Sequence, residues 1–205
     1  MSTGYLETGR SSQKQRTRRA LIEAAQQLVS DGVVPTVEAA ATLAGISRTT
    51  AYRYFENQHA LLAVAHPETA ASTLLPPTPP EGAADRLDAV ISAFTQLIAD
   101  TEAQQRTMLR LSLEQDEATR AALPLRQGRA IGWIGEALEP LAGELTTAEI
   151  QRLVLAIRAV TGIEALVWLT DVAGLDRADA RALMRWSAAA LLRSAEAGDP
   201  PPVGQ

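Results

Sequence analysis

The sequence predicts an all-α protein of about nine helices, in which a small three-helix head precedes a larger helical body. Three observations favour this class. Alanine and leucine are abundant and alternating runs of β-branched residues are absent, which favours helices over strands. Apolar residues recur at three- and four-residue intervals, as they do along one face of a helix. Residues that cap helices, and glycines or prolines that end them, stand between these apolar segments.

Four helices are predicted in residues 13–73. The first runs from about Gln13 to Ser30, and Gly32 follows it as a left-handed C-terminal cap. Each of the next three follows a residue whose side-chain oxygen can accept from the first free backbone N–H groups of a helix. These three cover residues 37–44, 48–55 and 58 to about 71, after Thr36, Ser47 and Asn57 respectively.

The prolines of Pro76-Pro77-Thr78-Pro79-Pro80 cannot continue a helix beyond its first turn, so this segment separates the head from the body. The body is predicted to contain helices at residues 83–99, 102–115, 119–139, 147–172 and 178–196. The resulting division is a flexible arm (1–12), a head (13–73), a body (81–198) and a short tail (199–205).

The charge is unevenly spread along the chain. The formal net charge is −5, yet residues 1–60 carry seven Lys or Arg and only five Asp or Glu. Five of the positive charges fall between Arg10 and Arg19, with no acid among them. Such a cluster attracts phosphates, although a solvated, partly disordered arm is an equally good explanation of a basic run alone.

Several function classes lack the residues that they require. The chain has no cysteine and only two histidines, His59 and His66, and it has no glycine-rich phosphate loop or nucleophile–base pair. We therefore expect no enzymatic activity, no cofactor and no metal site. The N-terminus is polar and basic, and no run approaches the roughly 18 apolar residues of a membrane span, so we expect a soluble, cytoplasmic protein without a membrane partner.

Residues 36–55 have the layout of a helix-turn-helix. The helix after Thr36 ends at Gly45, Ile46 fills the turn, and Ser47 begins the next helix. In such a unit the N-terminal half of the second helix enters the major groove of DNA. Arg48 is therefore the best candidate for a bidentate contact to guanine, and Thr49 and Thr50 lie beside it.

The same stretch resembles the signature of the TetR/AcrR family of transcriptional regulators over about residues 14–66. The matching positions include Ala44-Gly45-Ile46-Ser47, Thr50, Tyr52 and Phe55. The sequence departs from the family at Gln58, where a lysine is usual, and at Thr49, Ala51 and Tyr54. The residues predicted to contact DNA are Lys14, Arg16, Thr36, Ser47, Arg48, Thr49, Thr50, Tyr52, Arg53, Tyr54, Asn57 and Gln58, with Phe55 and Ile46 assigned to the core.

The resemblance implies that the body senses an effector and forms a homodimer through its last two helices. The residues support a dimer, because the helix from Ile150 to Leu169 is apolar nearly all round and must be buried on every side. Two recognition helices about 34–36 Å apart would then read both halves of a palindromic operator.

Bulky residues on separate body helices are candidates for an effector pocket that takes an apolar or aromatic ligand. Plain core packing is the alternative for each of them. Glu164 has two further explanations, a cationic or hydroxylated ligand or an arginine at the dimer interface. The candidates are Phe94, Met108, Leu111, Trp133, Ile134, Glu164 and Trp168.

The sequence thus favours a ligand-responsive repressor that binds double-stranded DNA and is released by a small molecule. The alternative is a DNA-binding adaptor whose body binds another protein. An enzyme is the third and least favoured class.

Overall fold

The computed structural model describes residues 3–33, 35–65, 71–114 and 129–202. Every regular element in these ranges is a helix, which confirms the predicted all-α class. The chain divides into two compact units, each described separately below. Within the described residues, the head unit contains 3–33, 35–65 and 103–114, and the body unit contains 71–102 and 129–202. Residues 103–114, which fall inside the predicted body range 81–198, thus group with the head.

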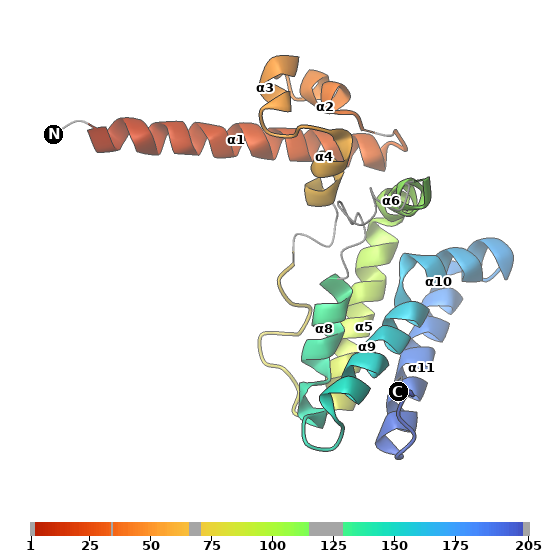
Figure 1. The fold of residues 1–205 in the computed structure, drawn as a ribbon. Coiled ribbons are helices and arrows are strands. Elements are labelled where there is room, and N and C mark those ends of the chain that lie inside the picture. The colour runs from red at the N-terminus through yellow and green to blue at the C-terminus, as the bar shows by residue number, and fades with distance from the viewer. Residues whose placement is uncertain (1–2, 34, 66–70, 115–128, 203–205) are drawn as a thin grey trace. The chain divides into compact units, whose positions relative to one another are not determined.

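The head unit is built on one long helix and several short ones (Figure 1). Its elements are α1 (Thr3–Ser30), α2 (Val37–Leu43), α3 (Arg48–Tyr52), α4 (Gln58–Ala65) and α6 (Glu102–Glu114). The first helix starts at Thr3, so it takes in residues 3–12, which were predicted as a flexible arm. The third ends at Tyr52 and not Phe55, because the amides of Arg53 and Tyr54 donate to the carbonyls of Thr50 and Ala51, three residues earlier, as in a 3₁₀ turn.

Two apolar clusters hold the head together. The larger one joins α1, α2, α3 and α4 through fully buried residues such as Leu21, Ala40 and Leu61. The smaller one packs Met108 of α6 against Val29 and Leu62. Beside it, the Gln104 side-chain amide donates to the Ser30 hydroxyl at 2.7 Å. α6 is therefore bound to the head by both apolar and polar contacts.

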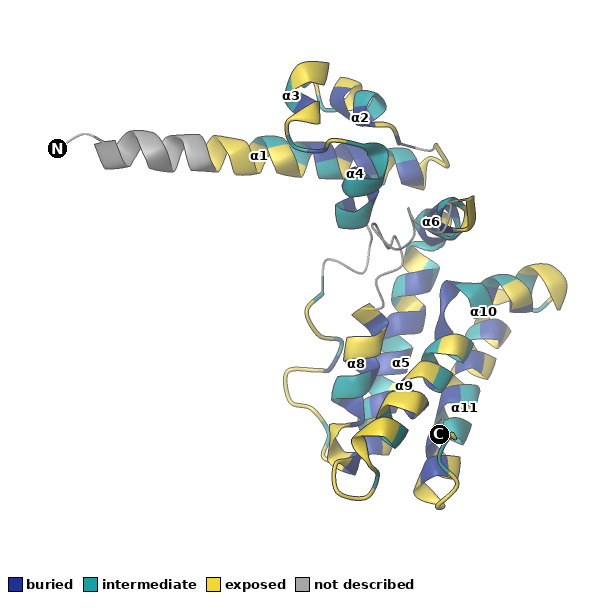
Figure 2. Ribbon diagram, viewed as in Figure 1, coloured by how far each residue is buried: buried dark blue, intermediate teal, exposed yellow. Residues whose placement is uncertain are grey.

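The body unit is a four-helix arrangement of α5 (Ala83–Asp100), α8 (Arg129–Ala137), α9 (Thr147–Thr161) and α11 (Arg177–Glu196). α5 packs on α8, α8 on α9, α9 on α11, and α11 on α5. Figure 2 shows the buried residues on the sides where these helices face one another. In the core, the rings of Phe94 and Trp133 meet edge to face, with centroids 6.0 Å apart. A 3₁₀ turn, Glu139–Leu141, follows α8.

The single helix predicted over 147–172 is wrong, because Gly162 interrupts it in an extended conformation. The chain continues as α10 (Ile163–Val167) and a π-helical turn, Trp168–Val172. Across the break, the guanidinium of Arg158 donates to the carboxylate of Glu164 at 3.1 Å. A Cβ atom at residue 162 would meet the ends of both side chains, so the ion pair would have to shift to admit a larger residue.

The stretch Thr147–Val172 is long and apolar enough to cross a membrane by length and composition, with a mean hydropathy of 1.8. A core helix of a soluble protein meets the same criterion. In this structure the stretch begins with a capping box between Thr146 and Glu149 and buries Leu153 and Ile157 among the body helices. These features are those of a helix in a packed core.

Candidate DNA-binding surface

The helix-turn-helix forms as its capping residues predict. The Thr36 hydroxyl accepts from the Ala39 amide at 3.0 Å and starts α2. Gly45 then adopts a φ of 66°, a left-handed conformation that a side chain would disfavour. The Ser47 hydroxyl accepts from the Thr50 amide and donates to the Thr50 hydroxyl at 2.8 Å, which starts α3. Thr36 and Ser47 therefore cap α2 and α3, as predicted.

The inner side of α3 is fixed by the head core. Ala51 is completely buried and Phe55, just beyond the helix, is nearly so, both in the cluster that contains Leu21 and Ala40. Ile46 packs at the edge of the same cluster. Because these positions face inward, the helix turns Arg48, Thr49 and Tyr52 outward, as the predicted recognition helix requires.

An acid that the sequence analysis did not select lies among these outward residues. Oε1 of Glu38, on α2, forms an ion pair with Nη2 of Arg48 at 2.8 Å and accepts from the Tyr52 hydroxyl at 2.7 Å. The guanidinium carbon of Arg48 also lies 5.7 Å from the centre of the Tyr52 ring. We call Glu38, Arg48 and Tyr52 the Glu38 cluster. Ten and fourteen residues separate Glu38 from its two partners, so no local periodicity in the sequence points to it.

The Glu38 cluster shifts the ionisation of two of its members. The hydrogen bond from Tyr52, followed by the backbone N–H of Glu38 and the charge of Arg48, holds the pKa of the Glu38 carboxyl below 4.5. The same hydrogen bond to the carboxylate raises the pKa of Tyr52 above 10.0. The cluster therefore contains a carboxylate, a guanidinium and a neutral phenol throughout the neutral pH range.

A second group of polar residues lines a groove between α1 and α3. The groove has a volume of about 430 Å³ and is lined by Gln13, Lys14, Thr17, Thr50, Arg53 and Tyr54. Four of these were predicted to contact DNA, and the structure brings them together from elements 36 or more residues apart. The analysis missed Gln13 and Thr17, although both share the exposed side of α1 with Lys14. Two amine or guanidinium groups and three hydroxyls in one groove suit a phosphate.

The other predicted contact residues lie at the edges of this surface. Arg16 is exposed on α1, one turn before Arg19. The Asn57 carboxamide oxygen accepts from the Ala60 amide at 2.8 Å and caps α4, as predicted. Gln58, the first residue of α4, is half-buried. That each of these residues contacts DNA stays a prediction.

The candidate effector residues lie in three separate places. Met108 and Leu111 pack in the head unit, against Val29 and Leu62. Phe94, Trp133 and Ile134 are buried in the core of the body unit. Glu164 and Trp168 line an open hollow of about 390 Å³ against α11, and Glu164 pairs with Arg158 of its own chain. The effector pocket stays a prediction, and residues 119–128 of the helix predicted over 119–139 lie outside the described residues.

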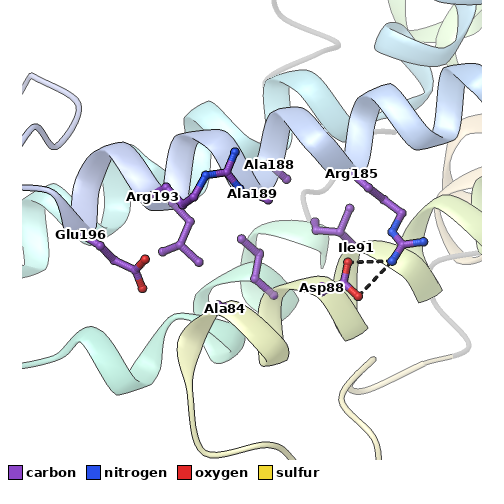
Figure 3. Close-up of a pocket in the computed structure, with 10 residues that line it drawn as sticks. Ala84, Asp88, Ile91, Arg185, Ala188, Ala189, Arg193 and Glu196 are labelled. Atoms are coloured by element: carbon purple, nitrogen blue, oxygen red, sulfur yellow. Dashed lines mark hydrogen bonds and ion pairs between the residues drawn. The ribbon is translucent and has the colours of Figure 1, made fainter.

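The body unit also has a cleft between α5 and α11 (Figure 3). At one end, Nη2 of Arg185 donates to both carboxylate oxygens of Asp88 at 2.7 and 2.9 Å, and Glu196 lies at the other end. Its floor is apolar, but its volume of about 150 Å³ is below the roughly 300–1,000 Å³ of sites for drug-sized ligands. We assign no effector to it. Nor do the described residues contain three His, Cys, Asp or Glu grouped to hold a metal ion.

No protein-family model and no curated protein sequence matches the chain. Among solved structures it is similar to a TetR transcriptional regulator from Rhodococcus sp. RHA1, with a TM-score of 0.61. The match covers 88% of this chain and 98% of that chain. The chain has the TetR fold. At 19% sequence identity the likeness concerns the fold, and the activity of the chain is argued below from its residues.

Proposed function

We propose that the chain is a ligand-responsive transcriptional repressor that binds a palindromic DNA operator as a homodimer. The observation that carries this proposal is the outward side of α3, where Arg48 has a side chain 73% exposed at the start of a capped helix. In a helix-turn-helix that position faces base edges in the major groove. The likeness in fold to the Rhodococcus regulator supports the proposal.

The charges of the head support DNA as the partner. Lys14, Arg16 and Arg53 are exposed, and none of them has an ion pair within the described part of the head. Lys14 on α1 and Arg53 directly after α3 line the groove that contains Thr50 and Tyr54. Unpaired cations beside a recognition helix bind phosphates and release counterions, so affinity should fall steeply with salt.

Exposed apolar residues near the end of the chain support a homodimer. Leu155 of α9, Trp168 and Val172 of the π-helical turn, and Leu183 and Trp186 of α11 are large apolar residues that stay exposed in the single chain. Trp168 and Leu183 meet across the hollow of about 390 Å³. We infer that a second copy covers this face, which accounts for the apolar character of residues 150–169 on every side. The symmetry of such a dimer matches a palindromic operator.

Repression and its release follow from the proposed dimer. An effector that binds the body better in one arrangement than in another would shift the dimer away from the spacing that fits two major grooves. An apolar or aromatic ligand suits a body whose core contains Phe94, Trp133 and Ile134. We assign the protein to the cytoplasm on the same grounds, because its operator lies on the bacterial chromosome.

The test of this proposal is selection of DNA from sheared genomic fragments, repeated over a series of salt concentrations. We expect the wild type to enrich a short palindrome, and Arg48→Ala to lose or relax the preference at one base pair of each half-site. Arg193→Ala is the matched control, since it removes an equally exposed arginine from α11 in the body. A wild type that enriches no sequence at any salt concentration contradicts the proposal.

A further inference from the structure

An acid on a surface that binds DNA is unfavourable for affinity, because a carboxylate repels the phosphates that provide most of the binding energy. Glu38 nevertheless lies among the outward residues of the helix-turn-helix, with a side chain 39% exposed. It does not serve as the cap of α2, since the hydroxyl of Thr36 has that role. Its position therefore requires an explanation in terms of what it contacts.

One oxygen atom of Glu38 links the two ends of the recognition helix. Oε1 pairs with the guanidinium of Arg48, the first residue of α3, and accepts from the hydroxyl of Tyr52, the last one. The ring of Tyr52 lies beneath the guanidinium of Arg48 at 5.7 Å. A free arginine side chain samples many rotamers, and fixing it costs up to about 2 kcal/mol of entropy. The contacts of Arg48 with the Glu38 carboxylate and the Tyr52 ring already restrict this side chain in the unbound protein, so less entropy is lost on binding DNA.

We propose that Glu38 is a specificity-determining residue that positions Arg48 for one base of the operator. Arg48 pairs with Glu38 through Nη2, and its planar guanidinium has further N–H donors for the two acceptors on a guanine edge. The inference rests on the proposed function, because it assigns a role within the DNA-reading surface.

Two effects of the carboxylate act in the same direction on selectivity. Its negative charge weakens binding to every DNA sequence by a similar factor, since all sequences present the same phosphates. Its hold on Arg48 strengthens binding only to a sequence whose base accepts the guanidinium in that position. The ratio of affinities for the selected operator and for a singly substituted one therefore isolates positioning from simple charge repulsion.

The experiment compares Glu38→Gln with the wild type and with Glu56→Gln. Glutamine keeps the size of the side chain and removes its charge. Glu56 is exposed in the head, just after α3, so Glu56→Gln removes one negative charge from the same unit without touching Arg48. Each protein is titrated with the operator selected by the wild type, with operators changed at the base pair whose preference Arg48→Ala relaxes, and with unrelated DNA.

We expect both glutamine variants to bind unrelated DNA more tightly than the wild type does. Only Glu38→Gln should lose discrimination at the Arg48 base pair, by about three- to tenfold out of the roughly ten- to hundredfold that a bidentate arginine–guanine contact provides. Tyr52→Phe, which removes the hydroxyl and keeps the ring beneath Arg48, should show a smaller loss at the same base pair. Thermal unfolding of each variant shows whether it is folded, and Tyr52→Phe carries the test if Glu38→Gln is not.

Equal discrimination by the wild type, Glu38→Gln and Tyr52→Phe overturns the inference while leaving the proposed function intact. A loss of discrimination that is as large in Glu56→Gln also overturns it, because the effect is then one of charge. A wild type without any sequence preference overturns the proposed function and this inference together.

Discussion

Replacing Trp186 by alanine should break the proposed dimer. The Trp186 side chain is 62% exposed in the single chain, although tryptophan is among the most costly side chains to leave in water. For a residue surface of roughly 250 Å², about 150 Å² would become buried in each protomer. At about 25 cal/mol per Å² this corresponds to at most about 4 kcal/mol for each copy, before the costs of association.

Truncations of central tryptophans in measured interfaces usually cost about 2–4 kcal/mol. We therefore expect Trp186→Ala to raise the dimer dissociation constant at least about 30-fold, and Trp168→Ala, whose side chain is 58% exposed, to do so by a similar factor. Sedimentation equilibrium over a series of protein concentrations measures this constant. Leu113→Ala is the control, since Leu113 is 65% exposed but lies on α6 in the head unit, and it should leave the constant unchanged.

Two results would refute the reasoning. If neither tryptophan variant shifts the dissociation constant by more than about threefold, the apolar face around α10 and α11 is not the interface. If the wild type is a monomer at every concentration, the chain has no homodimer to break, and the exposed apolar face requires another partner. The second result would favour the adaptor over the repressor, because a lone head contacts too few base pairs for selective binding.

Three further outcomes test the structure of the two units. Phe94→Leu should lower the free energy of unfolding by about 2–3 kcal/mol in urea titrations, since it removes the edge-to-face contact with Trp133 and the ring beneath Arg158; a change below about 1 kcal/mol would contradict this packing. Ser47→Ala should lower stability by about 1 kcal/mol and weaken DNA binding, because α3 has only five residues and loses its cap; unchanged melting and unchanged affinity would show that the cap is dispensable. The Thr146 amide and hydroxyl donate to Glu149 and depress the pKa of its carboxyl, so the stability from this box is present above pH 4.5 and is lost as the pH falls through the lowered pKa. The melting temperature of Glu149→Gln should therefore fall less than that of the wild type as the pH is lowered below 4.5. Parallel pH profiles of the two proteins would exclude a contribution of the capping box to stability.

Local signals in the sequence predicted most helix boundaries of the head. Thr36, Ser47 and Asn57 each cap the helix assigned to them, because a side-chain oxygen acts on amides only three residues away. Phe55 lies in the core as predicted, since alternation of apolar and polar positions within a short helix reports directly on which side is inward. Caps and apolar periodicity depend on residues a few positions apart, so they can be recognised in a single sequence.

The errors occurred where contacts between side chains decide the outcome. The break at Gly162 was missed because the flanking segments are both apolar, and the pairing of Arg158 with Glu164 across it becomes visible only in three dimensions. Glu38 was missed for the same reason, as its partners lie ten and fourteen residues away on another helix. The effector role of Met108 and Leu111 stays a prediction, but their size did not show that they pack against Val29 and Leu62.

The course of α6 bears on how a ligand in the body could affect the head. Its first residue, Glu102, belongs to the body unit, where its carboxylate accepts from Nε and Nη2 of Arg177 at 2.6 and 3.0 Å. Two residues later, Gln104 donates to Ser30 of α1, and Met108 packs against Val29. A helix is stiff over so short a distance, because each turn is held by its own backbone hydrogen bonds. A proposed effector that moves Arg177, at the start of α11, would therefore act first on Glu102 at the start of α6.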